Sequence, residues 1–189
     1  MFKNHSLKKH FRRHGYVVVR AAYDMSTNAG ELSKMYQYSL SAPKSDPDEQ
    51  VPGAPAHYSD VNMNKILIRM MPVLERVTGK HLFPTYSYFR VYNSGSVLPR
   101  HTDRAACEIS CSMHLGRGSD HAWPLWVRDR SGKEVPVKLE PGDCLVYSGC
   151  ELEHWRDMPE KSIEEFSQVF LHYVDQNGPY ANAILDNKI

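Results

Sequence analysis

The chain has 189 residues, with 23 basic and 22 acidic side chains and a formal net charge of +1. This length allows one domain with a substantial core and leaves little room for a second. The balanced charge provides no overall field that would attract nucleic acid or an anionic membrane. No apolar run approaches the roughly 20 residues that span a bilayer, and the N-terminus, polar from Lys3 onward, lacks the apolar core of a secretory signal. We therefore expect a soluble, cytoplasmic protein.

The segment before residue 41 predicts two helices and a short strand. Residues 7–14 have a helical pattern, and the β-branched run over residues 16–20 is typical of a buried strand. The polar residues Ser26, Thr27 and Asn28 are suited to cap a second helix, which we expect to continue to about Leu40.

Residues 41–57 carry four prolines, one glycine and several charges without an apolar period, which predicts a long loop. A loop of this length is a lid over a site, a binding segment or a disordered connector. Asp60 can then cap a third helix, whose apolar residues recur at three- and four-residue steps until Gly79 ends it.

After Lys80 the apolar pattern changes to a period of two. Three segments each place polar or aromatic side chains on one face and apolar side chains on the other: residues 86–92, 108–115 and 166–173. Such strands suit a sheet covered by helices outside and folded around a polar cavity inside. We predict an α+β, mainly β fold, a jelly-roll-like barrel with N-terminal supporting helices. The whole chain, residues 1–189, would form one domain, with helical support and the loop over residues 1–80 and the barrel core over residues 81–176.

Four cysteines are too few and too irregularly spaced for a disulfide scaffold, and no CxxC pair indicates a zinc site. We expect reduced, mostly buried thiols at Cys107, Cys111, Cys144 and Cys150.

The candidate metal ligands are His101, Asp103 and His154. Residues i and i+2 of an extended segment point to the same side, so His101 and Asp103 can bind one ion together. Two imidazoles and one carboxylate, with three positions left open, form the set that suits non-heme Fe(II) used for oxygen chemistry. The alternative is a histidine that is merely hydrogen-bonded to a carboxylate, with His154 unrelated.

The segments around these ligands resemble the Fe(II)- and 2-oxoglutarate-dependent oxygenases, which have a double-stranded β-helix core. The resemblance covers residues 86–175, and locally it is most similar to the prolyl hydroxylase branch. It rests on a Tyr-x-x-Gly strand exit before the HxD motif, a Pro-Gly-Asp turn before a strand, one later histidine and the last strand: residues 90–95, 99–103, 139–143, His154 and residues 167–174.

The resemblance implies a metal role for His101, Asp103 and His154, and a cosubstrate role for Tyr92 and His114. Most relatives place an Arg or Lys at the start of the last strand, where it pairs with the distal carboxylate of 2-oxoglutarate. This chain has Phe166 there, and the other inward residues of that strand are Gln168 and His172. Arg90, on the same face as Tyr92, is the best substitute for the missing cation. Other basic residues near the motifs are Arg100, Arg104, Arg156 and Lys161.

Several of these residues have ordinary structural alternatives. Tyr92, His114 and His172 could be buried core residues, and Arg90 could pair with Glu108 or another acid of the barrel. As candidate substrate contacts we name Arg104, Glu108 and Trp126, although the first two could simply pair with each other and the tryptophan could pack in the core.

The resemblance implies a 2-oxoglutarate-dependent dioxygenase with Fe(II), 2-oxoglutarate and O2, and with ascorbate as a candidate stimulant. We expect it to hydroxylate an amino-acid or peptidyl side chain, with release of succinate and CO2. The partners would be a small molecule or peptide, with no nucleic acid or membrane, and the oligomeric state stays open. The alternatives are a nucleobase demethylase of the same family, a non-catalytic cupin-like metal or ligand binder and a zinc hydrolase with the same three ligands.

Overall fold

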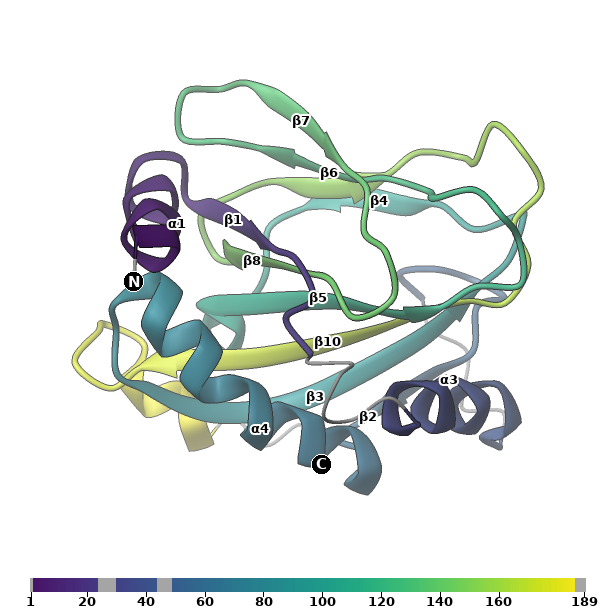
Figure 1. Ribbon diagram of the computed structural model, residues 1–189, viewed down its shortest axis with the longest axis horizontal. Coiled ribbons are helices and arrows are strands. Elements are labelled where there is room, and N and C mark those ends of the chain that lie inside the picture. Colours follow the sequence, from purple (N-terminus) through teal and green to yellow (C-terminus); the bar gives the residue numbers. More distant parts are fainter. Residues whose placement is uncertain (1, 24–29, 44–48, 186–189) are drawn as a thin grey trace.

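Two antiparallel sheets face each other in the computed structural model, which describes residues 2–23, 30–43 and 49–185 (Figure 1). The larger sheet has the order β1 (Tyr16–Val19), β8 (Cys144–Ser148), β5 (Ile109–Gly116), β10 (Phe166–Asp175), β3 (Leu82–Tyr92), β2 (Ala56–Tyr58). The smaller sheet has the order β4 (Leu98–His101), β9 (His154–Arg156), β6 (Leu125–Arg128), β7 (Glu134–Val137). The predicted α+β, mainly β barrel is confirmed.

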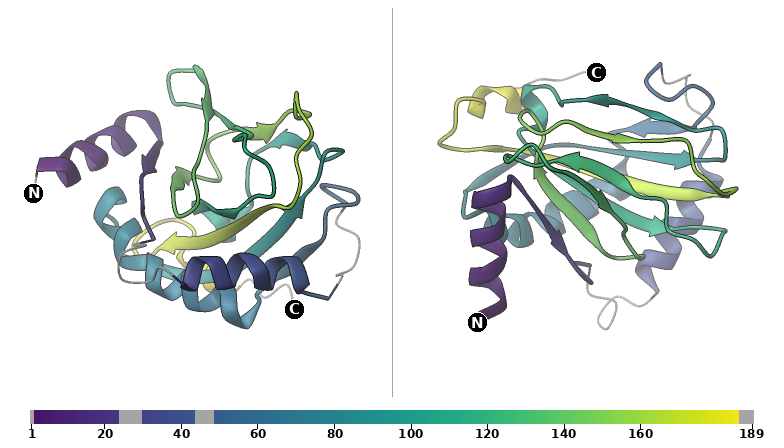
Figure 2. Two further views of the ribbon diagram at one scale, coloured as in Figure 1. Left: turned by 45° about the vertical axis from the view of Figure 1, so that its right-hand side comes forward. Right: turned by 90° about the horizontal axis from the view of Figure 1, so that it is seen from above.

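Helices α3 (Glu31–Ser41) and α4 (Val61–Thr78) cover the outer face of the larger sheet, and α1 (Phe2–His14) lies beside α4 (Figure 2). Two short 3-10 helices, η1 (Ala105–Cys107) and η2 (Ala181–Leu185), follow β4 and β10. No helix in the described ranges is long and apolar enough to cross a membrane.

The capping prediction for α4 is confirmed. Asp60 accepts hydrogen bonds from the backbone N–H groups of Asn62 and Met63, at 2.9 and 3.0 Å. Gly79 ends the helix in the left-handed conformation, with φ of 73°. The apolar stripe of this helix is fully buried against the sheet: Met63, Leu67, Met70, Leu74 and Val77.

Alternation along the strands separates two cores. On β5, Ile109, Cys111 and Met113 pack toward the helices, while Ser110 and Ser112 face the space between the sheets. A second apolar cluster fills part of that space, including Tyr92, Leu125 and Phe166. The polar inner faces predicted from the sequence therefore surround the interior of the barrel.

Two predictions about the N-terminal part need correction. Helix α1 begins at Phe2, earlier than expected. The predicted cap at residues 26–28 lies outside the described residues, and α3 has Gly30 at its N-cap. Strand β1 is half-buried rather than buried, since it is an edge strand of the larger sheet and only Val17 is fully covered.

The predicted loop over residues 41–57 also contains structure. Its last residues form the start of β2, which pairs with β3, and Val51 and Ala54 are buried in the core between the sheets. Strands β1 and β2 thus add one edge strand to each side of the larger sheet; β1 was expected from the sequence, whereas β2 comes from a segment that we expected to be a loop. Residues 44–48 lie outside the described part of the chain.

Candidate metal centre

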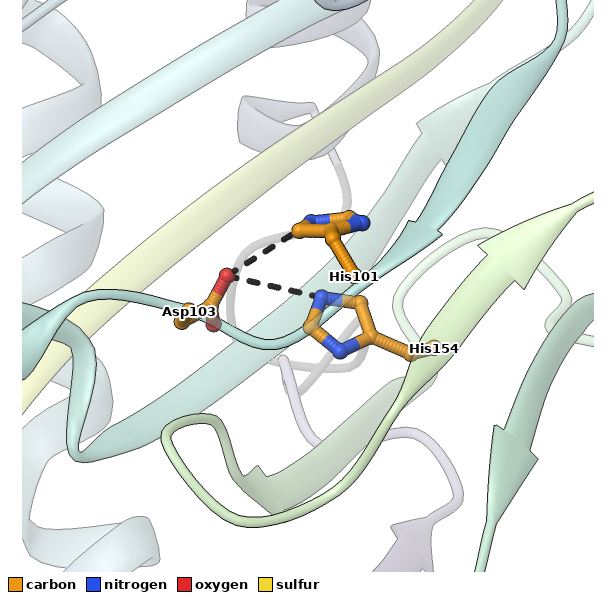
Figure 3. A group of neighbouring side chains, drawn as sticks. All are labelled: His101, Asp103 and His154. Carbon is orange, nitrogen blue, oxygen red and sulfur yellow. Dashed lines mark ion pairs between the residues drawn. The ribbon is translucent and has the colours of Figure 1, made fainter.

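His101 and His154 stand directly opposite each other on the paired strands β4 and β9. Asp103 follows two residues after His101, and its Oδ1 lies 3.7 Å from His101 Nε2 and 3.5 Å from His154 Nε2 (Figure 3). All three ligand atoms lie within 4.8 Å of one another. The structure therefore brings together the three residues that the sequence predicted.

Backbone carbonyls fix the orientation of both imidazoles. His101 Nδ1 lies 2.8 Å from the carbonyl oxygen of Pro99, and His154 Nδ1 lies 3.0 Å from that of Leu152. Because a carbonyl only accepts, each Nδ1 carries the proton, which leaves the lone pair of each Nε2 directed toward Asp103. This is the arrangement that metal-binding histidines commonly have.

The electrostatics also fit a cation. Burial alone would raise the pKa of Asp103, but the neighbouring His154 and His172 and the hydrogen bond from Ser110 hold it well below its usual range. Burial and the neighbouring His154 lower the pKa of His101, so its imidazole is neutral near pH 7. A carboxylate and neutral imidazoles are the ionisation states in which these side chains bind metals.

The separations suit an octahedral divalent ion as well. Bonds of about 2.1 Å place adjacent ligand atoms of an octahedron about 3 Å apart. The observed separations of 3.5 and 3.7 Å exceed this by about 0.5 and 0.7 Å, which side-chain rotations on binding an ion can close. The three residues thus fit a metal bound on one face.

A cavity of about 340 Å³ opens beside the three ligands. Arg90, Arg104 and His172 contribute to its lining, together with the aromatic residues Tyr58, Tyr86, Tyr88, Tyr147 and Phe170. The cavity therefore combines a metal-binding face, two guanidinium groups and several rings, which suits an anionic ligand with apolar parts.

Arg90 is almost fully buried, with 1% exposure, and points into this cavity from β3. Its Nη1 donates to the Tyr92 hydroxyl at 3.3 Å, and its Nη2 lies 3.0 Å from the Tyr88 hydroxyl and 3.2 Å from Gln50 Oε1. The predicted pairing with Glu108 is not among these contacts.

Arg156 brings a second buried guanidinium to the same region. It projects from β9, two residues after His154, and lies 5.5 Å from the Tyr92 ring centroid and 5.1 Å from that of Phe166. Arg156 thus places a cation from another strand beside Phe166, the residue that the sequence resemblance aligns with the anchoring position. Burial lowers the pKa of Arg156 to about 10, and the group stays charged at neutral pH.

Three predicted cosubstrate residues are buried but do not line the cavity: Tyr92, His114 and Gln168. His114 stacks on Phe166 at 4.3 Å, and burial together with Arg156 and Arg117 lowers its pKa to about 3. Gln168 donates to the Ser112 hydroxyl at 2.8 Å. Tyr92, His114 and Gln168 thus lie inside the barrel near Arg90 and Arg156.

Two of the predicted substrate contacts lie elsewhere. Glu108 accepts from the backbone N–H of Asp175 at 2.8 Å and pairs with Lys80 at 3.5 Å, because its backbone is helical at the end of η1 and leaves the strand alternation. Trp126 lies on the outer side of the smaller sheet, 6.0 Å from Trp155, since its neighbours Leu125 and Val127 face inward. Only Arg104 of the three lines the cavity.

Sequence reasoning missed several cavity residues. The Tyr147 hydroxyl lies 3.4 Å from His154 Nε2, and its inward position follows from alternation along the strand after the Pro-Gly-Asp turn. Tyr58 and Tyr86 stack at 4.4 Å, but Tyr58 belongs to a strand that the sequence did not predict. Cys107 lies 3.0 Å from the Tyr86 hydroxyl, and no pattern in the sequence indicated that contact.

Comparisons by sequence found no matching family model and no significantly similar curated protein. Comparisons by structure found many similar chains. The epimerase SnoN from nogalamycin biosynthesis, described as a non-heme α-ketoglutarate-dependent enzyme, superimposes with a TM-score of 0.75 at 15% identity, over 98% of this chain and 89% of that one. A prolyl-4-hydroxylase from Pseudomonas putida gives 0.67 at 14% identity, over 93% and 100% of the two chains.

HygX from Streptomyces hygroscopicus, solved with nickel and 2-oxoglutarate bound, gives a TM-score of 0.69 at 12% identity over 91% and 87% of the two chains. At these identities the similarity establishes the fold. The chain has the double-stranded β-helix fold of the 2-oxoglutarate- and Fe(II)-dependent oxygenases.

Proposed function

We propose that this protein is an Fe(II)- and 2-oxoglutarate-dependent dioxygenase that hydroxylates an amino-acid or peptidyl side chain. The observation that carries the proposal is the convergence of His101 Nε2, His154 Nε2 and Asp103 Oδ1 beside a cavity that also contains a buried arginine. Bound Fe(II) with 2-oxoglutarate would supply an oxidant strong enough to attack a C–H bond, at the cost of decarboxylating the cosubstrate.

The ligand set supports iron rather than a closed structural metal. Two histidines and one carboxylate leave three octahedral positions open, enough for a bidentate 2-oxo acid and oxygen. The carboxylate ligand also favours hydroxylation over halogenation, since a halide would need the position that Asp103 takes.

The inner end of the cavity supports an anionic cosubstrate. Arg90 on β3 stands opposite Gln168 on β10 in the strand register. Gln168 is four residues along β10 from His172, and His172 is connected to Asp103 through Ser110. Four residues of a strand span about 13 Å. The cavity thus has room between the metal ligands and Arg90 for a short dicarboxylate, and we assign Arg90 as the anchor of its distal carboxylate, with Arg156 supporting the same corner through Tyr92.

The mouth of the cavity supports an amino-acid or peptide substrate. Arg104, directly after the ligand Asp103, lies 4.9 Å from the Tyr86 ring centroid, and its Nη2 donates to the Tyr58 hydroxyl at 3.3 Å. A guanidinium held by two tyrosines can bind a carboxylate or a backbone carbonyl while the rings contact the apolar part of a substrate.

The test is turnover by purified protein loaded with Fe(II), given 2-oxoglutarate, oxygen and a panel of amino acids and short peptides. We expect succinate formation that disappears without oxygen and in His101→Ala, and a product that has gained one oxygen atom. A product of unchanged mass would indicate epimerisation, the reaction named for SnoN. Oxygen-independent hydrolysis by the zinc-loaded protein, with no succinate, would overturn the proposal in favour of a zinc hydrolase.

A further inference from the structure

The two oxygens of the Asp103 carboxylate have different neighbours. Oδ1 faces His101 and His154, at 3.7 and 3.5 Å, whereas Oδ2 accepts a hydrogen bond of 2.8 Å from the Ser110 hydroxyl. An oxygen engaged in this way has part of its electron density directed away from the metal position. The carboxylate is therefore arranged to bind a metal through one oxygen.

Ser110 is itself held by His172. The two residues are directly opposite each other on β5 and β10, and Ser110 Oγ lies 3.0 Å from His172 Nδ1. Their exposures are 0% and 6%, so water does not compete strongly for these contacts. The pairing of β10 with β3 shifts register between Leu171 and Tyr173, which makes His172 an irregular position of the strand. Such irregularities re-aim side chains beside functional sites.

The chemistry of the Asp103 carboxylate, the Ser110 hydroxyl and the His172 imidazole indicates which group donates in each hydrogen bond. A carboxylate only accepts, so the single hydroxyl proton of Ser110 points to Asp103 Oδ2 and its oxygen accepts from the N–H at His172 Nδ1. The Cys107 carbonyl oxygen, 3.1 Å away, is a second acceptor for the same proton, but the carboxylate oxygen is nearer and charged. By donating from Nδ1, His172 holds the serine oxygen in place and does not itself take the serine proton.

Gly149 also lies directly against Asp103 and Ser110. Its carbonyl accepts from the Asp103 backbone N–H at 2.8 Å. A Cβ atom on this residue would overlap Asp103 Oδ2 and the Cys107 carbonyl oxygen, and would lie 2.7 Å from Ser110 Oγ. The absence of a side chain at this position is thus required for the carboxylate and the hydroxyl to occupy their places.

We infer that Ser110 and His172 are positioning residues that orient the Asp103 carboxylate so that Oδ1 faces the metal position. The inference rests on the proposed function, because it takes Asp103 as a metal ligand. Its consequence is that three coordination positions stay open, since a carboxylate binding through both oxygens would occupy one of the positions needed by the cosubstrate or oxygen.

The experiment measures the affinity of the metal-free protein for Mn(II), a redox-stable probe of the Fe(II) position, without 2-oxoglutarate or turnover. Three variants are compared. Ser110→Ala removes the hydroxyl, and His172→Gln moves the amide nitrogen too far out to donate to Ser110. His172→Asn places its amide nitrogen where Nδ1 was and should keep that hydrogen bond. Ser112→Ala is the matched control, because Ser112 faces the same interior from the same strand but bonds Gln168. Thermal melting of each metal-free variant reports whether it folds.

Loss of such an outer partner typically weakens metal binding about 10- to 100-fold. We expect that loss in Ser110→Ala and His172→Gln, and affinities within about threefold of wild type in His172→Asn and Ser112→Ala. Wild-type affinity in folded Ser110→Ala, or an equal loss in Ser112→Ala, would overturn the inference while leaving the metal site intact. If the His172 variants do not fold, the two serine variants decide. Failure of the wild type to bind Mn(II) would overturn the proposed function as well.

Discussion

His101 and His154 form a cross-strand pair between β4 and β9, with ring centroids 4.2 Å apart. The 52 residues between them in the sequence include strands of both sheets, β5 and β8 of the larger and β6 and β7 of the smaller. The position of the metal ligands therefore depends on the register of β4 and β9.

Replacing Arg90 with Gln should raise the dissociation constant of 2-oxoglutarate about 10- to 100-fold, because a charge-assisted hydrogen bond contributes about 1.5–3 kcal/mol. An anaerobic titration of the Fe(II)-loaded protein with 2-oxoglutarate measures it. Arg128→Gln is the control, since Arg128 bonds Glu153 at 2.9 Å on the smaller sheet, away from the cavity lining.

Unchanged affinity in Arg90→Gln would rule out Arg90 as the anchor. A large loss of 2-oxoglutarate affinity in Arg156→Gln alone would then assign the anchoring role to Arg156 on β9.

Replacing Gly149 with Ala should weaken Mn(II) binding and lower the melting temperature of the metal-free protein. The added Cβ would overlap Asp103 Oδ2 and the Cys107 carbonyl oxygen, so the turn after β8 or the carboxylate must move. Gly95→Ala is the control, because its nearest neighbour would be Asn93 Oδ1 at 3.8 Å. Equal behaviour of the two variants would contradict the close approach at Gly149.

Replacing His114 with Gln should make the stability of the protein less sensitive to acid. Burial, with Arg156 and Arg117 nearby, lowers the pKa of His114 from 6.5 to about 3. Below pH 6.5 the unfolded chain therefore binds a proton that the folded chain does not, and stability falls as the pH decreases toward the folded-state value.

Between pH 6.5 and 4.5 the free energy of unfolding of the wild type should therefore fall by about 2 kcal/mol more than that of His114→Gln. Urea unfolding at several pH values measures the difference, and parallel curves for the two proteins would contradict it.

Replacing Asp60 with Ala should destabilise the protein by about 1–2 kcal/mol, because α4 loses its N-cap. Asp60 also accepts from the Tyr38 hydroxyl at 2.6 Å, which places the expected effect toward the upper end. Denaturant unfolding checks this, with Tyr38→Phe separating the two contributions. A loss in Tyr38→Phe as large as that in Asp60→Ala would contradict the capping role.

The barrel and the proximity of His101 to Asp103 could be predicted from the sequence because both depend on local alternation. His101 and Asp103 share a face by their spacing, and the segments after Lys80 alternate clearly. The register that places His154 opposite His101 is a tertiary property, and it became visible only in the folded chain.

The errors in the candidate site have physical reasons. Glu108 was assigned inward by extending the alternation of β5 one residue too far, into a helical backbone. The alternation of β6 directs Leu125 and Val127 inward, so Trp126 faces outward. The burial of Arg156 could be suspected from its two-residue spacing from His154, but its approach to Phe166 depends on how the two sheets face each other. Strand β2 was missed because three residues carry too little periodicity.

The most direct test of the metal and cosubstrate assignment is an absorbance titration without oxygen. Fe(II) followed by 2-oxoglutarate should produce a weak visible charge-transfer band in the wild-type protein, and the band should be absent in His101→Ala. No band in the wild type, or an equal band in the variant, would contradict the account.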